Sequence, residues 1–129
     1  MLSGIHSIIS NQDNEELRKP ISEQEIIEAI WALQPDKSPS PDGFTINFYW
    51  AASNIIKDDL RKMLNWTRKK HKIGGATNST FLVLIPKDKN PLSIDRFHPI
   101  YLCNTSYKIL TKILATRMKK IMAKIILDT

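Results

Sequence analysis

Residues 79–87, STFLVLIPK, are the clearest strand signal in the sequence. An uninterrupted apolar run that stops at Pro86 is typical of a short β-strand, because proline cannot donate to the hydrogen-bonding ladder of a sheet. Residues 88–95, DKNPLSID, predict a polar turn, and residues 98–104, HPIYLCN, predict a second extended segment. The sequence therefore predicts an antiparallel hairpin with strands near residues 80–86 and 98–102, joined by an irregular tip of about ten residues.

A long amphipathic helix is predicted after the hairpin, over residues 104–126, with Asn104 or Thr105 as its cap. We expect its core-facing side to be an apolar stripe at helical spacing: Tyr107, Leu110, Leu114, Met118, Ile121 and Ile125. Four lysines lie mostly off this stripe, where they either form a solvated surface or contact a polyanion: Lys108, Lys112, Lys119 and Lys124.

The start of another helix is marked near residue 22. Ser22 and Glu25 have the spacing of a capping box, and the neighbouring Ile21 and Ile26 stand at hydrophobic-staple positions. This helix should end at Pro35, because the residue before a proline avoids the helical region. Residues 1–19 show no sustained periodicity, so they are interpreted as a leader or linker.

Residues 44–70 also predict helix, in two pieces. Phe48 and Tyr49 should face the core in the first piece. In the second piece the core-facing residues should be Ile56, Leu60, Met63 and Thr67. Together the segments predict a mostly α-helical chain with one small antiparallel β-hairpin, an α+β fold of about one domain in length.

Charge divides the chain into two halves. Residues 1–60 carry four Lys/Arg against ten Asp/Glu, whereas residues 61–129 carry fifteen against three. A basic half of this kind attracts polyanions, of which a phosphate backbone is the commonest. The alternative is a solvated lysine surface without a partner.

The cysteine content and the hydropathy bear on location. Cys103 is the only cysteine, which excludes an internal disulfide framework and favours the nucleus or cytoplasm over secretion. The apolar residues 4–9, GIHSII, are too short and too polar for a signal peptide, and no window approaches a membrane span. We expect no membrane contact and no zinc site, since no Cys/His pair has zinc spacing. The oligomeric state is left open.

Three stretches in fixed order resemble the start of a reverse transcriptase domain of non-LTR (LINE-type) retrotransposons, especially the plant kind. They are PDKSPSPDGF (35–44), STFLVLIPK (79–87) and FHPIYLCNTSYKILTKILATRMK (97–119). The family typically reads DKAPGPDGF, then LIPK, then RPISLCN followed by YKIIAKILANRLK. The likeness implies that residues 20–129 are the N-terminal, fingers part of such a domain, truncated before the palm and thumb.

The resemblance implies contacts with RNA or an RNA–DNA hybrid and, weakly, with a deoxynucleotide triphosphate. The proline-glycine loop frames the fingers near the template in the family, and here it corresponds to Lys37, Pro41, Asp42, Gly43 and Phe44. Lys87 matches the lysine of LIPK and His98 the arginine of RPIS, which lie near the triphosphate and template in the family. An ammonium at a strand end can neutralise phosphate charge. For the nucleic-acid backbone we expect contacts from six basic residues: Lys69, Lys70, Lys108, Lys112, Arg117 and Lys119.

Three residues depart from the family pattern. His98 replaces an arginine and lacks its bidentate fork, Ser40 replaces a glycine and Tyr101 replaces a serine. Together these departures suggest a copy that has drifted without selection for polymerisation.

The catalytic carboxylates of the family are not among these residues. Nucleotidyl transfer uses two metal ions about 3.5–4 Å apart, and the family holds them with palm motifs of the F-x-x-x-D and A-D-D type. The basic half contains only Asp88, Asp95 and Asp128, and the first two lie in the hairpin tip. We therefore expect this segment to hold no cofactor and to be inactive as an enzyme, although the complete family domain uses Mg²⁺.

Two other functions stay open. One is a small basic nucleic-acid-binding module without enzymatic activity, in which Trp66, Tyr101 or Tyr107 stacks on bases. The spacing of these aromatic residues favours burial instead. The other is an interaction protein that is phosphorylated at its Ser-Pro sites, Ser38 and Ser40.

Overall fold

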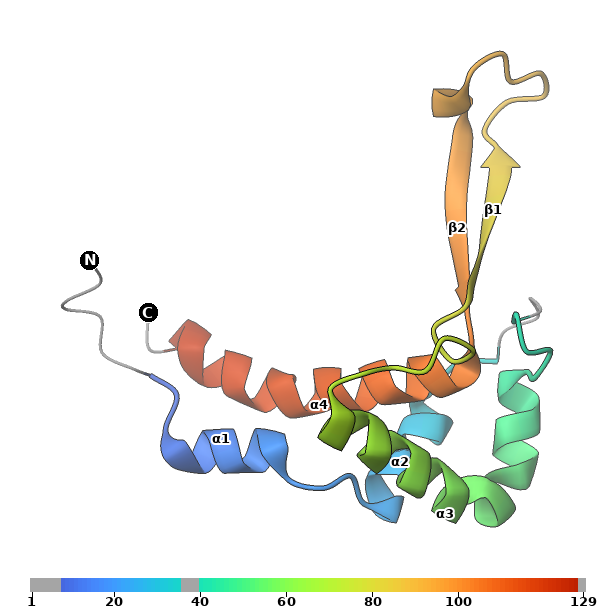
Figure 1. The fold of residues 1–129 in the computed structure, drawn as a ribbon. Coiled ribbons are helices and arrows are strands. Elements are labelled where there is room, and N and C mark those ends of the chain that lie inside the picture. The colour runs from blue at the N-terminus through green and yellow to red at the C-terminus, as the bar shows by residue number, and fades with distance from the viewer. Residues whose placement is uncertain (1–7, 36–39, 128–129) are drawn as a thin grey trace.

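A helical body carries a projecting β-hairpin in the computed structural model, which describes residues 8–35 and 40–127 (Figure 1). The elements follow in the order α1 (Asn11–Arg18), α2 (Glu23–Ala32), α3 (Ile46–Lys70), β1 (Thr80–Pro86), the short 3₁₀ turn η1 (Ile94–Arg96), β2 (Phe97–Cys103) and α4 (Thr105–Leu127). The predicted α+β class, mostly helical with one antiparallel hairpin, is confirmed.

The hairpin agrees closely with its predicted limits. β1 and β2 pair antiparallel, with Thr80 opposite Cys103 and Pro86 opposite Phe97. The hairpin stands away from the helices (Figure 1), and every residue from Phe81 to Ile85 is between 39% and 58% exposed. A two-stranded hairpin gains little stability from burial by itself, so its direction depends on how its base is joined to the body.

The core lies where α2, α3 and α4 meet. Four side chains there are completely buried: Ile26, Ile30, Leu64 and Ile109. The predicted capping box is confirmed, because the Ser22 hydroxyl accepts from the Glu25 N–H while the Glu25 carboxylate accepts from the Ser22 N–H. Ile21 and Ile26 are both buried, as their staple positions predict.

α3 is one continuous helix of 25 residues, so the prediction of two pieces was wrong. No proline or glycine interrupts residues 46–70, and Thr45 caps the helix by accepting from the Phe48 N–H. Tyr49 and Leu60 are buried as expected, whereas Phe48 is exposed. The helix ends at His71, which adopts the left-handed conformation with φ 51°.

Residues 11–18, which the sequence analysis placed in a leader or linker, form the helix α1. Ser10 and Asp13 make a capping box at its start. α1 lies beside the C-terminal half of α4 (Figure 1), and Lys124 Nζ of α4 lies 2.6 Å from Asp13 Oδ1.

α4 begins at Thr105, as predicted, but the predicted stripe is only partly its buried face. Leu114 and Met118 are exposed, whereas the buried positions are Thr105, Ser106, Ile109, Leu110, Ile113, Arg117 and Ile121. At 3.6 residues per turn, the buried face is centred roughly a quarter of a turn from the predicted stripe. In the part of the chain that the structure describes, no helix is long and apolar enough to cross a membrane.

Candidate functional site

Asn104 joins the proline-glycine loop to the base of the hairpin. Its side chain is almost completely buried, and its Oδ1 accepts from the Asp42 N–H at 3.0 Å. Its Nδ2 donates to the carbonyl oxygens of Ala76 at 2.7 Å and Thr77 at 3.3 Å. One amide therefore connects the loop, the segment before β1 and the start of α4, which are distant in sequence.

The loop itself is held by short hydrogen bonds. Gly43 has φ +79° and its N–H donates to the Ser40 carbonyl at 2.9 Å, while the Phe44 N–H donates to Asp42 Oδ1 at 3.0 Å. The Ser40 hydroxyl lies 2.7 Å from both Asp42 Oδ1 and the Phe44 carbonyl oxygen, and Thr105 Oγ1 donates to the same carbonyl at 3.2 Å. Ser40, which departs from the family pattern, therefore contributes hydrogen bonds that hold the loop.

Of the two proposed phosphorylation sites and the predicted loop lysine, only Ser40 lies within the described residues. Ser40 is buried, so its hydroxyl is not presented to a kinase in this conformation. Ser38 and Lys37 lie outside the described residues. Of the other predicted loop residues, Pro41 is half-buried, and Asp42, Gly43 and Phe44 are exposed.

Lys87 and His98 lie near the far end of the hairpin. Lys87 Nζ donates to the Asp95 carbonyl at 3.1 Å, and the Lys87 N–H donates to the Arg96 carbonyl at 2.8 Å. His98 stands opposite Ile85. Side chains alternate between faces along a strand and cross-strand partners share a face, so Lys87 and His98 lie on the same face.

Arg96 is a residue that the sequence analysis missed. It is the last residue of the 3₁₀ turn η1, directly before β2, and its carbonyl accepts from the Lys87 N–H, so its backbone lies opposite Lys87. Its guanidinium lies 3.1 Å from the Asp88 carboxylate in an exposed ion pair. The signal that could have found it is the hairpin pairing, which brings it opposite Lys87.

The structure does not bring all the predicted residues into one pocket. His98 and Asn104 are six positions apart in the sequence, which corresponds to roughly 20 Å along an extended strand. The loop is therefore hydrogen-bonded at the base of the hairpin, whereas Lys87 directly follows β1 and His98 lies near the start of β2, at the far end of the hairpin.

Three predicted backbone contacts share one side of α4. Lys108, Lys112 and Lys119 fall within about 40° of one another around the helix, on the side away from the core. Lys69 and Lys70 are exposed in the last turn of α3. Lys124, by contrast, pairs with Asp13.

Arg117 is not a solvent-facing phosphate contact, contrary to its sequence-based assignment. Its side chain is only 7% exposed and donates to both carboxylate oxygens of Glu25, at 2.7 and 2.8 Å. It also donates to three backbone carbonyls: Leu17, Lys19 and Pro20. The Arg117 hydrogen bonds lower the pKa of Glu25 to about 2, against the opposing effect of burial.

The aromatic side chains are more exposed than expected. Trp66 is 51% and Tyr101 65% exposed, so the expectation of burial was wrong for both, whereas Tyr107 is half-buried. Beside the loop, Phe44 and Phe48 form an exposed ring pair with centroids 4.8 Å apart. Burial is the main cause that raises the pKa of the neighbouring Tyr49.

The described acidic residues do not fit a two-metal centre. Within residues 8–35 and 40–127, no three His, Cys, Asp or Glu side chains are grouped so that they could hold a metal ion. Asp88 pairs with Arg96, and the Asp95 carboxylate accepts from the Ser93 hydroxyl.

The comparisons with known proteins point to a transposon. No family model matches the chain. Over 119 residues the chain is 29% identical to a protein of Xenopus laevis, the "Transposon TX1 uncharacterized 149 kDa protein". The match covers 92% of this chain but only 9% of the Xenopus protein. The chain is therefore similar to a short part of a transposon protein.

Proposed function

We propose that the chain is the fingers portion of a reverse transcriptase from a LINE-type retrotransposon, and that it binds template RNA and nucleotide phosphate. The observation that carries this proposal is the meeting of two family-like motifs at Asn104, which joins the loop to the segment that follows the hairpin. The similarity to a transposon protein over nearly the whole chain supports the same assignment.

The hairpin supplies the nucleotide-contacting part of this function. Lys87 donates to a neutral carbonyl, so its bond to Asp95 leaves its positive charge uncompensated. A triphosphate oxygen is a stronger acceptor for an ammonium than a carbonyl oxygen is. His98 lies on the Lys87 face, and the Arg96 backbone is hydrogen-bonded to Lys87, so both residues add N–H donors near Lys87.

The helices supply the contacts to the nucleic-acid backbone. Lys108, Lys112 and Lys119 form one cationic side of α4, and Lys69 and Lys70 extend the last turn of α3. Contacts of this kind neutralise phosphates without reading bases, so binding should tolerate any sequence and weaken steeply with salt. Among the described residues no three His, Cys, Asp or Glu side chains are grouped to hold a metal ion, and we propose no polymerase activity for this part of the chain alone.

Nucleotide binding at Lys87 tests the proposal. Photo-crosslinking of a labelled deoxynucleotide triphosphate to the full chain should fall at least about fivefold in Lys87→Gln, while RNA affinity stays unchanged. Lys89→Gln is the matched control, because it removes an equal charge from the exposed hairpin tip. Equal crosslinking in the wild type and Lys87→Gln, or an equal loss in Lys89→Gln, would contradict the nucleotide role.

The exposure of Trp66 and Tyr101 favours a second candidate, a small nucleic-acid-binding module without a nucleotide site. Exposed aromatic rings stack on single-stranded bases, at about 1–3 kcal/mol per base. Under this reading, Tyr101→Ala weakens RNA binding and Lys87→Gln leaves nucleotide crosslinking unchanged.

A further inference from the structure

A groove of about 700 Å³ lies between α1, the C-terminal end of α3 and α4. Its floor is aliphatic and is formed by side chains from all three regions: Leu17, Ile21, Ile73, Leu110 and Leu114. Exposed apolar surface in a concave site is typical of a place where another molecule binds.

Basic side chains also line this groove. The residues that line the groove include Arg18, Arg68, His71 and Lys72, and none of the described lining residues is acidic. Arg68 donates to the Arg18 carbonyl at 2.9 Å and to Asn65, so its guanidinium is held in place without a carboxylate partner. Arg117 also lines the groove, but Glu25 already compensates its charge.

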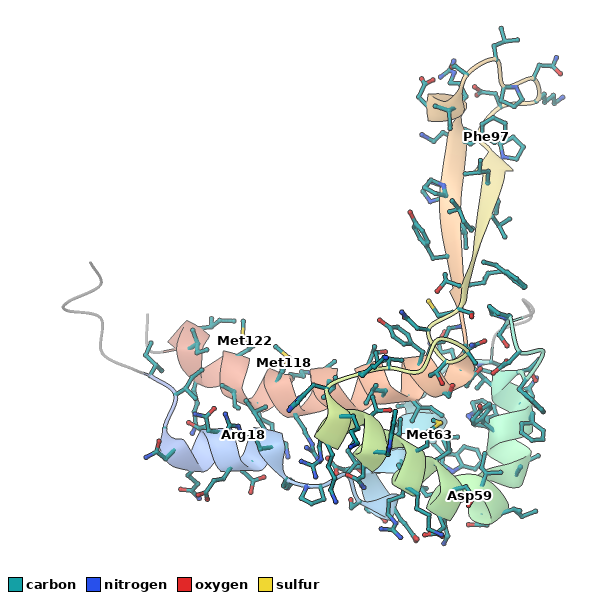
Figure 2. The ribbon with its side chains drawn as sticks, in the orientation of Figure 1. Arg18, Asp59, Met63, Phe97, Met118 and Met122 are labelled. Carbon is teal, nitrogen blue, oxygen red and sulfur yellow. The ribbon has the colours of Figure 1, made fainter. Side chains whose placement is uncertain are left out.

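The apolar surface continues beyond the groove along α4. Leu114, Met118 and Met122 recur every four residues and are 44%, 54% and 45% exposed. Figure 2 shows Met118 and Met122 side by side on the side of α4 that faces away from α1. Methionine side chains adapt to the shape of a partner and are common on surfaces that bind helices.

We propose that this groove, together with the stripe of Leu114, Met118 and Met122, docks an acidic amphipathic helix of a partner protein. Leucine or isoleucine side chains of the partner fill the aliphatic floor, and its Asp and Glu side chains meet Arg18, Arg68 and Lys72. RNA is the less favoured occupant, because none of the described residues that line the groove is Phe, Tyr or Trp, the side chains with the largest stacking surfaces.

A second copy of this chain does not provide the required helix from its described acidic helices. α1 has a single large apolar residue, Leu17, which itself lines the groove. The aliphatic face of α2 is occupied, since Ile26 and Ile30 are completely buried. The described acidic helices of a second copy are therefore not the occupant, and the inference does not depend on the proposed reverse transcriptase function.

Two matched synthetic peptides test the inference by fluorescence anisotropy on the full chain. Each is a helix of about 18 residues with leucine on one face, and the other positions are Glu in one peptide and Lys in the other. We expect the acidic peptide to bind at least about tenfold more tightly. Lys72→Glu and Leu114→Asp should each weaken it at least about fivefold, whereas Lys89→Glu, at the distant hairpin tip, should change it less than about twofold.

Lys72, Leu114 and Lys89 are all exposed, so the variants should fold, which circular dichroism checks. Equal affinity for the two peptides would overturn the inference, as would equal effects of Lys72→Glu and Lys89→Glu. A single-stranded RNA that displaces the acidic peptide, and that itself binds less tightly to Leu114→Asp, would make the groove a nucleic-acid site and also overturn it.

Discussion

Arg117 donates five hydrogen bonds to groups that are 92 to 100 residues away in sequence. A guanidinium has five N–H donors, so its capacity is fully used. The sequence shows only that a cation stands at this position on α4. Its acceptors, Glu25 and the carbonyls that follow α1, become neighbours only when α1 and α2 pack on α4, and this is why charge alone assigned it to phosphate.

Replacing Arg117 should be among the most destabilising single changes. In Arg117→Ala the Glu25 carboxylate and three carbonyls lose their donors, so we expect a loss of about 3–5 kcal/mol in the free energy of unfolding. Urea denaturation followed by circular dichroism measures it. Lys120→Ala, an exposed lysine one turn away, should cost less than about 0.5 kcal/mol. Similar costs for the two variants would contradict the role of Arg117.

The Glu25–Arg117 pair should also make stability depend on acid. The pKa of Glu25 is lowered from 4.5 to about 2, so its folded form binds a proton less readily than its unfolded form. The resulting stabilisation is complete above the unfolded pKa and is lost as pH falls from about 4.5 towards 2. Urea midpoints measured from pH 6 to about pH 2.5 should fall less steeply in Arg117→Gln than in the wild type. Parallel pH profiles would refute this linkage.

Gly43 occupies a conformation that other residues adopt only with strain, with φ +79°. No atom lies within 4 Å of an added Cβ, so Gly43→Ala should lose only the conformational term, about 1–2 kcal/mol. Gly74→Ala is the control, since Gly74 has neither a positive φ nor a close neighbour, and it should be neutral or stabilising. Thermal unfolding measures the stability of both variants. An equal change in unfolding temperature for Gly43→Ala and Gly74→Ala would show that the conformation of Gly43 is not strained for alanine.

The hydrogen bonds of the Asn104 side chain connect the base of the hairpin to the proline-glycine loop. Asn104→Asp keeps the shape of the side chain but replaces its donor with a carboxylate oxygen facing the carbonyls of Ala76 and Thr77. We expect the free energy of unfolding to fall by about 1–3 kcal/mol. Hydrogen exchange should become faster at the Asp42 amide, which donates to Asn104 Oδ1. Asn78→Asp, an equal change at an exposed position, should leave both unchanged. Unaltered exchange at Asp42 in Asn104→Asp would rule out this connection.

Local patterns predicted the elements whose signals are local. The capping box of Ser22 and Glu25 and the limits of β1 needed only neighbouring residues. α1 was missed because it has one large apolar residue, Leu17, and depends on contacts with α4. The spacing of Ser10 and Asp13 could have shown its start. The stripe predicted for α4 differs from the buried face of the helix, because the sequence shows which residues are apolar but not where the neighbouring helices cover them.

At the scale of the whole molecule, the acidic half of the chain neutralises part of the basic half. Asp13 and Glu25 pair with Lys124 and Arg117 of α4. Lys112 lines a pocket together with Glu25 and Glu28, whereas Lys119 is exposed. The charge division predicted a basic surface, but only the packing shows that Lys124 and Arg117 are used within the fold.

The candidate site was predictable in its parts and not in its arrangement. The motifs identified the loop at Gly43 and the cations at Lys87 and His98. Long-range packing determines that the loop is hydrogen-bonded to Asn104 at the base of the hairpin. It also determines that most of the length of β2 separates Asn104 from His98. Motif order alone could not supply them.

Binding of single-stranded RNA distinguishes a nucleic-acid-binding segment from a solvated basic surface. Anisotropy titrations of a labelled RNA between about 50 and 200 mM salt should show weak, sequence-tolerant binding whose logarithm falls linearly with that of the salt concentration. Replacing Lys108, Lys112 and Lys119 together by Gln should flatten the slope by roughly 0.7 to 1 unit per lost phosphate contact, whereas Lys62→Gln, on α3, should leave it unchanged. A folded chain that does not bind RNA at about 50 mM salt would contradict the nucleic-acid-binding role. A triple variant with the wild-type salt dependence would contradict the role of these three lysines.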